Sequence, residues 1–195
     1  QELNEDEINV KILLNGLTGG HSGAEIHKGL GNSNKILFEL IQKLNSDFDV
    51  KICSIDGGGL RNAIPRESSA IISFDEDNLN SFKKIMKNTS KTLVAEFKET
   101  DDNINLEFEL LENRFQTLGA IESKELINAI NECPNGVFEM SENIDGLVET
   151  SNNLANIRLI EGKLKIQCLT RSSSENSKDK LSKIISNIFE NIRCD

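Results

Sequence analysis

The sequence predicts an α+β fold made of two tandem ferredoxin-like α/β sandwiches, each with an antiparallel sheet and helices on one face. Hydrophobic periodicity over residues 8–110 gives the order strand, helix, strand, strand, helix, strand, which is the ferredoxin-like plan. A hairpin pattern followed by an amphipathic helix appears in the second half. The 195 residues are enough for two small domains, which we place at 1–112 and 113–195. We expect the second to be the shorter.

The first half contains five clear periodic segments after its N-terminal strand at 8–14. Ser33 or Asn34 is expected to cap a helix over 36–44, because short polar side chains accept hydrogen bonds from the first helical N–H groups. Pro65 biases the preceding residue toward extended backbone at the start of a strand. The remaining segments predict strands at 50–55, 69–74 and 106–110 and a helix at 79–97.

The second half is less regular but carries three further elements. Residues 122–131 have helical periodicity, and apolar residues alternate on both sides of 161–162, which predicts a hairpin. Residues 181–192 carry a continuous helical stripe. Asn62 precedes a strand–helix unit and Asn153 precedes a hairpin–helix unit, which favours a structural repeat. Because asparagine is abundant here, chance similarity is the alternative.

Charge and cysteine usage exclude several classes of function. With 22 basic and 32 acidic residues, the formal net charge of −10 argues against binding to nucleic acid or to an anionic membrane. No apolar run is long enough to cross a bilayer, and no signal peptide is visible. The four cysteines follow no pairing rhythm, which is typical of reduced thiols in the cytoplasm. Abundant Asn, Lys, Ile and Glu suggest a bacterial coding bias.

Metal ligands are scarce in this chain. His21 and His27 are its only histidines, and no cysteine pair has metal-binding spacing, so we expect no metal site. The chain also begins at Gln1 rather than at methionine. We therefore expect it to be a piece of a longer protein.

A glycine-rich stretch separates the first predicted strand from the first helix. Five glycines between residues 19 and 31 surround His21, and glycine allows close backbone approach and positive φ. A histidine held in such a turn is placed to reach beyond its own domain. The alternative is a flexible surface loop with an incidental histidine.

Four segments stand out when they are taken together. They are 16–32, with Gly-Gly-His-Ser-Gly at its centre, then 60–67, then 134–137 together with 146–151, and finally 168–172. In this order they resemble the signatures of the bacterial aminoacyl-histidine dipeptidases, also called peptidase D or Xaa-His dipeptidases. This family is similar to carnosinases and other co-catalytic zinc peptidases. The polar stretch 113–125 has no close match in the pattern, and its role stays open.

The resemblance implies a metal-binding catalytic domain and, inserted into it, a lid of ferredoxin-like units. This chain resembles the lid alone. The resemblance therefore implies two zinc ions, or other divalent ions, in the full-length enzyme and none in this chain. It also implies that His21 donates a hydrogen bond to the substrate oxygen on which negative charge develops. His27 is expected to be a structural partner of the glycine turn.

Three more residues are candidates for substrate contacts. Arg171 ends the hairpin's second strand, where a guanidinium can bind the terminal carboxylate of a dipeptide in a bidentate fork. The alternative is a rim arginine in a weak salt bridge. Asn62 and Asn153 are candidates for holding the substrate backbone, since each amide has a donor and an acceptor. The alternative for both is turn formation.

The function expected from the sequence is that of a lid and substrate-binding domain of a cytosolic Xaa-His dipeptidase. Its expected partners are the dipeptide substrate, its own catalytic domain and a second copy of the chain. We expect this chain alone to be inactive. The alternative is a stand-alone ferredoxin-like module that binds amino acids or dimerises without catalysis.

Overall fold

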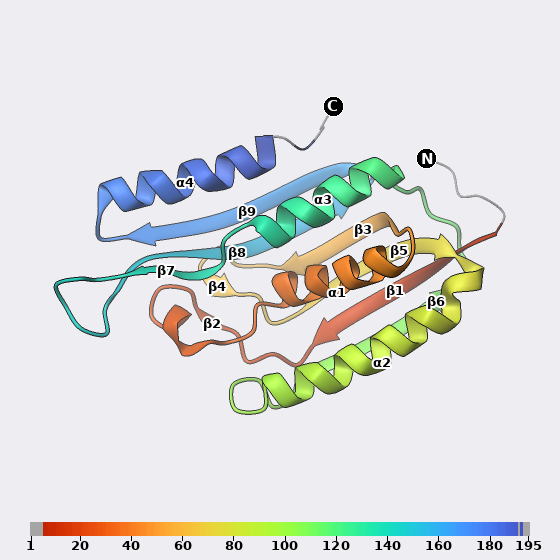
Figure 1. Cartoon of the computed structure of the whole chain (residues 1–195), viewed down its shortest axis with the longest axis horizontal. Helices are drawn as coiled ribbons and strands as arrows, with labels where there is room; N and C mark the ends of the chain where they lie inside the picture. The colour runs from red at the N-terminus through yellow and green to blue at the C-terminus, as the bar shows by residue number, and fades with distance from the viewer. Residues whose placement is uncertain (1–5, 191, 193–195) are drawn as a thin grey trace.

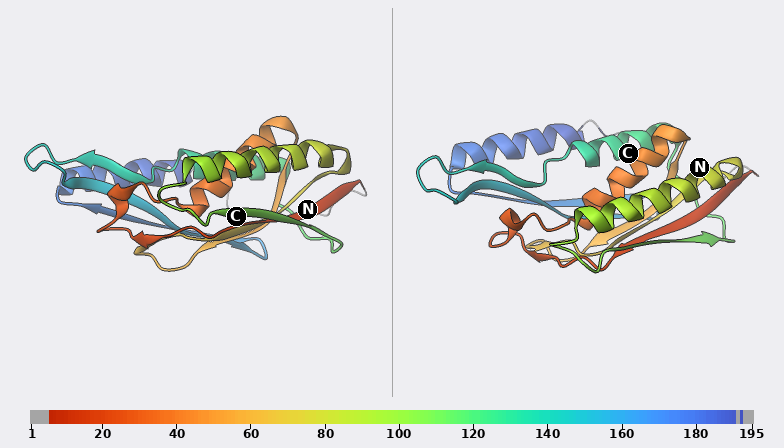
Figure 2. Two further views of the ribbon diagram at one scale, coloured as in Figure 1. Left: turned by 90° about the horizontal axis from the view of Figure 1, so that it is seen from below. Right: turned by 60° about the horizontal axis from the view of Figure 1, so that its bottom comes forward.

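The structure, a computed structural model, describes residues 6–190 and 192, and within them four α-helices cover one face of the main antiparallel sheet (Figure 1). Both views in Figure 2 show the helices on the same side of the strands. The helices are α1 (Ser33–Asp47), α2 (Leu79–Glu96), α3 (Ala120–Glu132) and α4 (Glu175–Glu190), with short 3-10 turns at η1 (Ile26–Lys28) and η2 (Glu76–Asn78). The strands are β1 (Glu7–Asn15), β2 (Gly20–His21), β3 (Lys51–Gly58), β4 (Ala63–Ile64), β5 (Ser68–Asp75), β6 (Asn105–Leu111), β7 (Gly136–Met140), β8 (Val148–Ile160) and β9 (Lys163–Ser172).

The first half has the predicted ferredoxin-like arrangement. Its strands lie in the order β6-β1-β5-β3, and each neighbouring pair is antiparallel. Along β1, Val10, Ile12 and Leu14 are buried while Lys11 is exposed, so the alternation seen in the sequence turns one face toward the helices. The predicted α+β class with an antiparallel sheet and helices on one face is therefore confirmed.

The second half continues the same sheet. The long strand β8 pairs with β9 along one side. On its other side, β8 pairs first with β7, where Gly136 faces Asn152, and then with β3, where Gly58 faces Asn156. An edge strand of the first half is thus covered by the second, which satisfies its backbone hydrogen bonds. The predicted division near residue 112 lies between β6 and α3 and stays a prediction.

Several local expectations are corrected by the structure. The N-cap of α1 is Asn32 rather than Ser33 or Asn34, because its side chain accepts hydrogen bonds from the N–H groups of Asn34 and Lys35. The strand expected to end at residue 55 continues to Gly58, where φ is +76°. The short strands β2, β4 and β7 were not predicted, since such short segments lack a recognisable period.

The core lies between the helices and the sheet. Phe74 stacks between Phe48 and Phe82, with ring centroids 5.1 Å apart in both pairs. The predicted hairpin turn is confirmed at Glu161 and Gly162, which both have positive φ, as two-residue turns between twisted strands require. No helix in the described part of the chain is both long and apolar enough to cross a membrane.

Candidate functional site

The glycine-rich loop is anchored at its base by a buried carboxylate. Asp101 is fully buried, and its two oxygens accept hydrogen bonds from Thr18 N–H at 2.8 Å and from Gly31 N–H at 2.9 Å. A buried carboxylate needs such donors, so this single side chain holds both ends of the loop together. Asp101 was missed by sequence reasoning, because an acidic residue after a helix has no distinguishing pattern. These contacts argue against the flexible-loop alternative.

The backbone around His21 is fixed by a two-strand ladder. In it, β2 pairs with β4, so that His21 faces Ala63, and Ser22 N–H donates to Asn62 O at 2.9 Å. The backbone N–H of His21 also donates to Glu25 Oε2 at 2.8 Å. Hydrogen bonds from Lys28 and from His21 N–H hold the pKa of the Glu25 carboxyl below its usual range, so it remains an anionic acceptor.

Hydrogen bonds to the imidazole define its tautomer. The N–H groups of Gly23 and Ala24 donate to His21 Nδ1 at 3.2 and 3.1 Å. Because Nδ1 is an acceptor, the proton of the neutral ring is on Nε2. The side chain is exposed, so Nε2–H is the group that can donate to a ligand. His27 lies further along, exposed on η1.

Arg171 and His21 meet at one glycine. A β-carbon built on Gly23 would lie 3.0 Å from His21 Cε1 and 3.3 Å from Arg171 Cζ. The two side chains therefore pack against the same backbone, although His21 comes from the first half of the chain and Arg171 from β9 in the second. A cation and a neutral N–H donor on one exposed surface form an arrangement suited to an anionic or carbonyl-bearing ligand.

The two predicted asparagines have different positions. Asn62 is exposed beside His21, and its carbonyl accepts from Ser22. Asn153 is 1% exposed, and its amide nitrogen donates to Ala63 O at 2.7 Å and to Arg61 O at 3.3 Å. The side chain of Asn153 therefore holds the segment that pairs with His21, and its amide hydrogens are used within the chain. Its predicted contact with substrate stays a prediction.

Asn153 is part of a polar seam between the two halves. The amide oxygen of Asn135 accepts hydrogen bonds from Asn32 Nδ2 at 2.9 Å and from Leu154 N–H at 3.0 Å. These bonds fill the gap on β8 between the ends of β3 and β7. The asparagine side chains of the seam are those of Asn32, Asn34, Asn135, Asn152, Asn153 and Asn156. Sequence reasoning attributed asparagine abundance to coding bias, whereas five of these side chains bond across the two halves and that of Asn152 bonds to Pro134 O within the second half.

The described residues do not fit a metal centre. Among residues 6–190 and 192, no group of three or more His, Cys, Asp or Glu side chains is placed to hold an ion. A zinc pair of the kind that the resemblance implies thus has no ligand set in the described part of this chain.

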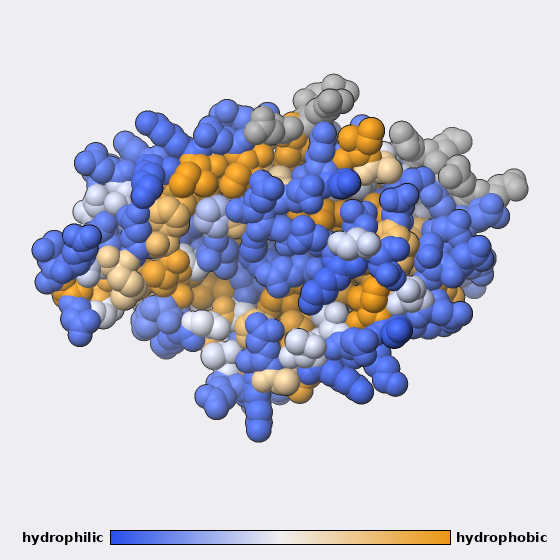
Figure 3. Space-filling view, in the orientation of Figure 1, coloured by the Kyte–Doolittle hydropathy of each residue, from blue (hydrophilic) through white to orange (hydrophobic). Residues whose placement is uncertain are grey.

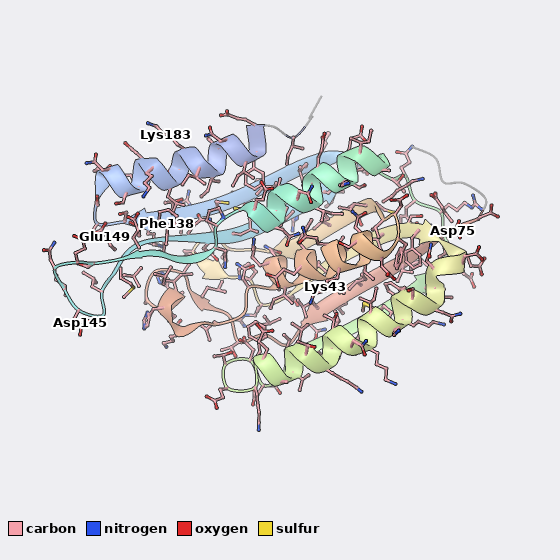
Figure 4. The ribbon with its side chains drawn as sticks, viewed as in Figure 1. Lys43, Asp75, Phe138, Asp145, Glu149 and Lys183 are labelled. Atoms are coloured by element: carbon pink, nitrogen blue, oxygen red, sulfur yellow. The ribbon has the colours of Figure 1, made fainter. Side chains whose placement is uncertain are left out.

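An apolar hairpin extends beyond the site. Strands β7 and β8 are joined by a loop that projects from the end of the sheet, with Asp145 at its tip (Figure 4). Three large hydrophobic side chains on it are exposed: Met140 by 48%, Ile144 by 58% and Leu147 by 42%. An apolar group of this kind is typical of a contact surface.

Comparison with known proteins shows what the first half of the chain is similar to. Residues 12–101 match the family model described as the peptidase dimerisation domain. The matched region runs from β1 to the loop that contains Asp101, so it covers most of the ferredoxin-like half and all of the His21 loop.

Two particular proteins extend the match to most of the chain. The cytosol non-specific dipeptidase of Escherichia coli (strain K12) is 37% identical over 169 residues, which are 87% of this chain and 35% of that protein. The crystal structure of aminoacylhistidine dipeptidase from Vibrio alginolyticus matches with a TM-score of 0.92 and 30% identity, over 97% of this chain and 39% of that one. The resemblance to aminoacyl-histidine dipeptidases is therefore confirmed, and the chain spans under two fifths of each relative's length.

Proposed function

We propose that this chain is the lid and substrate-clamping part of a dipeptide-hydrolysing enzyme, whose metal-binding catalytic domain is supplied by sequence outside it. The observation that carries the proposal is the meeting of His21 and Arg171 at Gly23. The similarity to two dipeptidases gives the class of reaction. One relative is named a non-specific dipeptidase and the other an aminoacylhistidine dipeptidase. Dipeptides are the substrates that the two names share, so we propose a dipeptide as the substrate.

Each side chain has a separate task. His21 donates its Nε2–H to the former carbonyl oxygen, where negative charge develops in the transition state. Arg171 binds the terminal carboxylate of the dipeptide in a fork of two hydrogen bonds. Because both pack against Gly23, the distance between the two recognised groups of the substrate is set by one backbone segment. Asn62 is exposed, its carbonyl accepts a hydrogen bond from Ser22 next to His21, and its side chain would contact the substrate backbone.

The rest of the enzyme supplies what this chain lacks. Two zinc or other divalent ions, held by the catalytic domain, would activate the attacking water. The exposed hydrophobic side chains of the β7–β8 hairpin would contact that domain, since buried contact with a neighbour would remove their apolar surface from water. The dimerisation description of the matched family supports pairing of two copies, and the name of the Escherichia coli relative supports a cytoplasmic location.

The test of the His21 role is its replacement in an enzyme that contains both this chain and the catalytic domain. His21→Ala should lower kcat by roughly 10²–10³, the usual effect of losing one oxyanion donor, with the fold intact. His27→Ala is the matched control, since His27 is an exposed histidine on the same loop, and it should leave kcat unchanged. A His21→Ala enzyme with normal kcat rules the proposal out.

The test of the Arg171 role uses two substrates. Arg171→Met should raise KM for free dipeptides far more than for the same dipeptides with C-terminal amides, because only the former present a carboxylate. Equal effects on both would refute carboxylate binding. Tight binding of free amino acids by the 195-residue chain alone would instead support a stand-alone module.

A further inference from the structure

Two cysteines that are distant in sequence lie together beneath the seam. Cys133 ends α3, and Cys168 lies in the middle of β9 beside Leu154 of β8. Their sulfur atoms are 3.8 Å apart. A disulfide bond is about 2.0 Å long, so the two sulfurs must approach each other by about 1.8 Å to form one. This pair could not be predicted from the sequence, because 34 residues separate its members.

Access from solvent is different for the two thiols. Cys133 is 1% exposed. Cys168 is partly exposed and lines a groove of about 410 Å³ between β9 and α4, together with Thr170, Ile185 and Phe189. Figure 3 shows hydrophobic surface along α4 within a mostly hydrophilic face. A small oxidant can therefore reach Cys168 from the groove, whereas Cys133 is shielded from solvent.

The electrostatic surroundings favour Cys168 as the reactive thiolate. The hydrogen bond between the two thiols lowers the pKa of Cys168, and the Lys35 ammonium acts in the same direction. That ammonium is fixed nearby by hydrogen bonds to the carbonyls of Ile130, Asn131 and Cys133 at 2.7–2.9 Å. The hydrogen bond to Cys168 and burial raise the pKa of Cys133. Cys168 is therefore the sulfur that reacts first with an oxidant, and Cys133 is the sulfur that reacts second, with Cys168.

We propose that Cys133 and Cys168 form a redox-active dithiol, which hydrogen peroxide or another small hydroperoxide converts to a disulfide. The Cys168 thiolate attacks the terminal peroxide oxygen, the O–O bond breaks, and Cys168 becomes a sulfenic acid while water or an alcohol leaves after protonation. The Cys133 sulfur then attacks the Cys168 sulfur, its proton leaves with the hydroxide as water, and the S–S bond forms. Two equivalents of a small thiol such as glutathione return both cysteines to thiols.

The bond would join two segments that lie next to the seam. Cys133 precedes the segment that carries Asn135, whose side chain binds Leu154 and Asn32. Cys168 lies three residues before Arg171 on the same strand. Oxidation therefore fixes the end of α3 to β9 close to the segment that positions Arg171. This inference does not depend on the proposed function.

The experiment treats the full chain with a small excess of hydrogen peroxide and measures intact mass, followed by peptide mapping. The expected product has lost about 2 Da, contains a Cys133–Cys168 linked peptide and returns to the starting mass with dithiothreitol. Its Tm should rise by roughly 5–10 °C, since a cross-link across this loop restricts the unfolded chain. A wild-type chain that stays fully reduced, or whose linked peptides join other cysteines, overturns the proposal.

Single variants test the order of attack. With Cys133→Ser, dimedone should trap a sulfenic acid at Cys168; with Cys168→Ser, Cys133 should remain unlabelled. Cys53→Ser is the matched control and should form the disulfide normally, because burial raises the pKa of the Cys53 thiol to about 12 and keeps it protonated. Cys194→Ser removes the fourth thiol, which lies outside the described residues, and should also leave the reaction unchanged. Loss of the disulfide in either control variant contradicts the assignment.

Discussion

Replacement of Asn153 by leucine should loosen the segment that holds His21. Leucine has the same branched arrangement of side-chain heavy atoms as asparagine, so Asn153→Leu keeps the skeleton of the side chain but has no hydrogen-bonding atoms. The substitution removes the donor to Ala63 O at 2.7 Å and to Arg61 O at 3.3 Å. Both carbonyls belong to the loop that includes β4, whose partner is β2. The substitution therefore acts on the β2–β4 ladder that carries His21 and leaves the His21 side chain itself unchanged.

The size of the effect follows from these two contacts. Each lost hydrogen bond contributes about 1 kcal/mol, and each carbonyl left without a donor in a partly buried position adds a further penalty, so we expect a loss of about 2–4 kcal/mol. If that loss falls on local opening, the opening equilibrium rises roughly 30- to 700-fold, at about 1.4 kcal/mol per factor of ten.

Amide hydrogen exchange measures this opening directly at Ser22, whose N–H donates to Asn62 O. Its exchange should accelerate by the factor given above. Asn152→Leu is the matched control: Asn152 is also 1% exposed, but its amide donates to Pro134 O, away from the His21 ladder. It should lower global stability and leave the relative protection of Ser22 intact. Equal acceleration at Ser22 in both variants would refute the role given to Asn153.

Three further predictions concern stability and are measured by urea unfolding. Lys35→Met should cost about 2–3 kcal/mol, because it removes an ammonium that donates to three carbonyls at the end of α3; a neutral result contradicts the cap. Gly58→Ala should cost more than about 3 kcal/mol, since its β-carbon would lie 2.0 Å from Ala155 O at a positive φ, whereas Gly59→Ala, with nothing within 4 Å, should be within about 0.5 kcal/mol of wild type. Burial raises the pKa of Cys53 to about 12 from an ordinary value of 9.0, so the unfolded chain loses this proton first and the stability due to the thiol, complete below pH 9, declines above it. The difference in unfolding free energy between wild type and Cys53→Ala should therefore fall by about 2 kcal/mol from pH 9 to pH 11, and a difference independent of pH would contradict the buried thiol.

Hydrophobic periodicity predicted the helices and strands that bury a single face. The alternation around Val10 and the helical stripe through Phe82 each report a single buried face, so strand β1 and helix α2 could be read from the sequence. The Glu161–Gly162 turn was predictable because its chemistry is local. The pairing of β3 with β8 was not, since nothing in either segment specifies a partner that lies about 100 residues away.

In the candidate site, too, some residues could be predicted from the sequence and others could not. The glycines around His21 marked it in the sequence, because close approach and positive φ restrict residue choice. The partners that fix the site were invisible: Asp101 and Asn153 act through contacts between distant segments, and their residue types are common on surfaces. That Arg171 lies against Gly23 could be known only from the folded chain.

The most direct test of the account is a comparison of kcat for His21→Ala, Gly23→Ala and wild type in an enzyme that includes the catalytic domain. A methyl group at Gly23 would press on His21 Cε1 and on the Arg171 guanidinium, so it perturbs both side chains at once while both remain present. We predict that kcat falls by roughly 10²–10³ for His21→Ala, that Gly23→Ala lowers kcat/KM, and that adding Gly23→Ala to His21→Ala costs less than it does alone. Full activity in both single variants would show that this corner of the chain takes no part in the reaction.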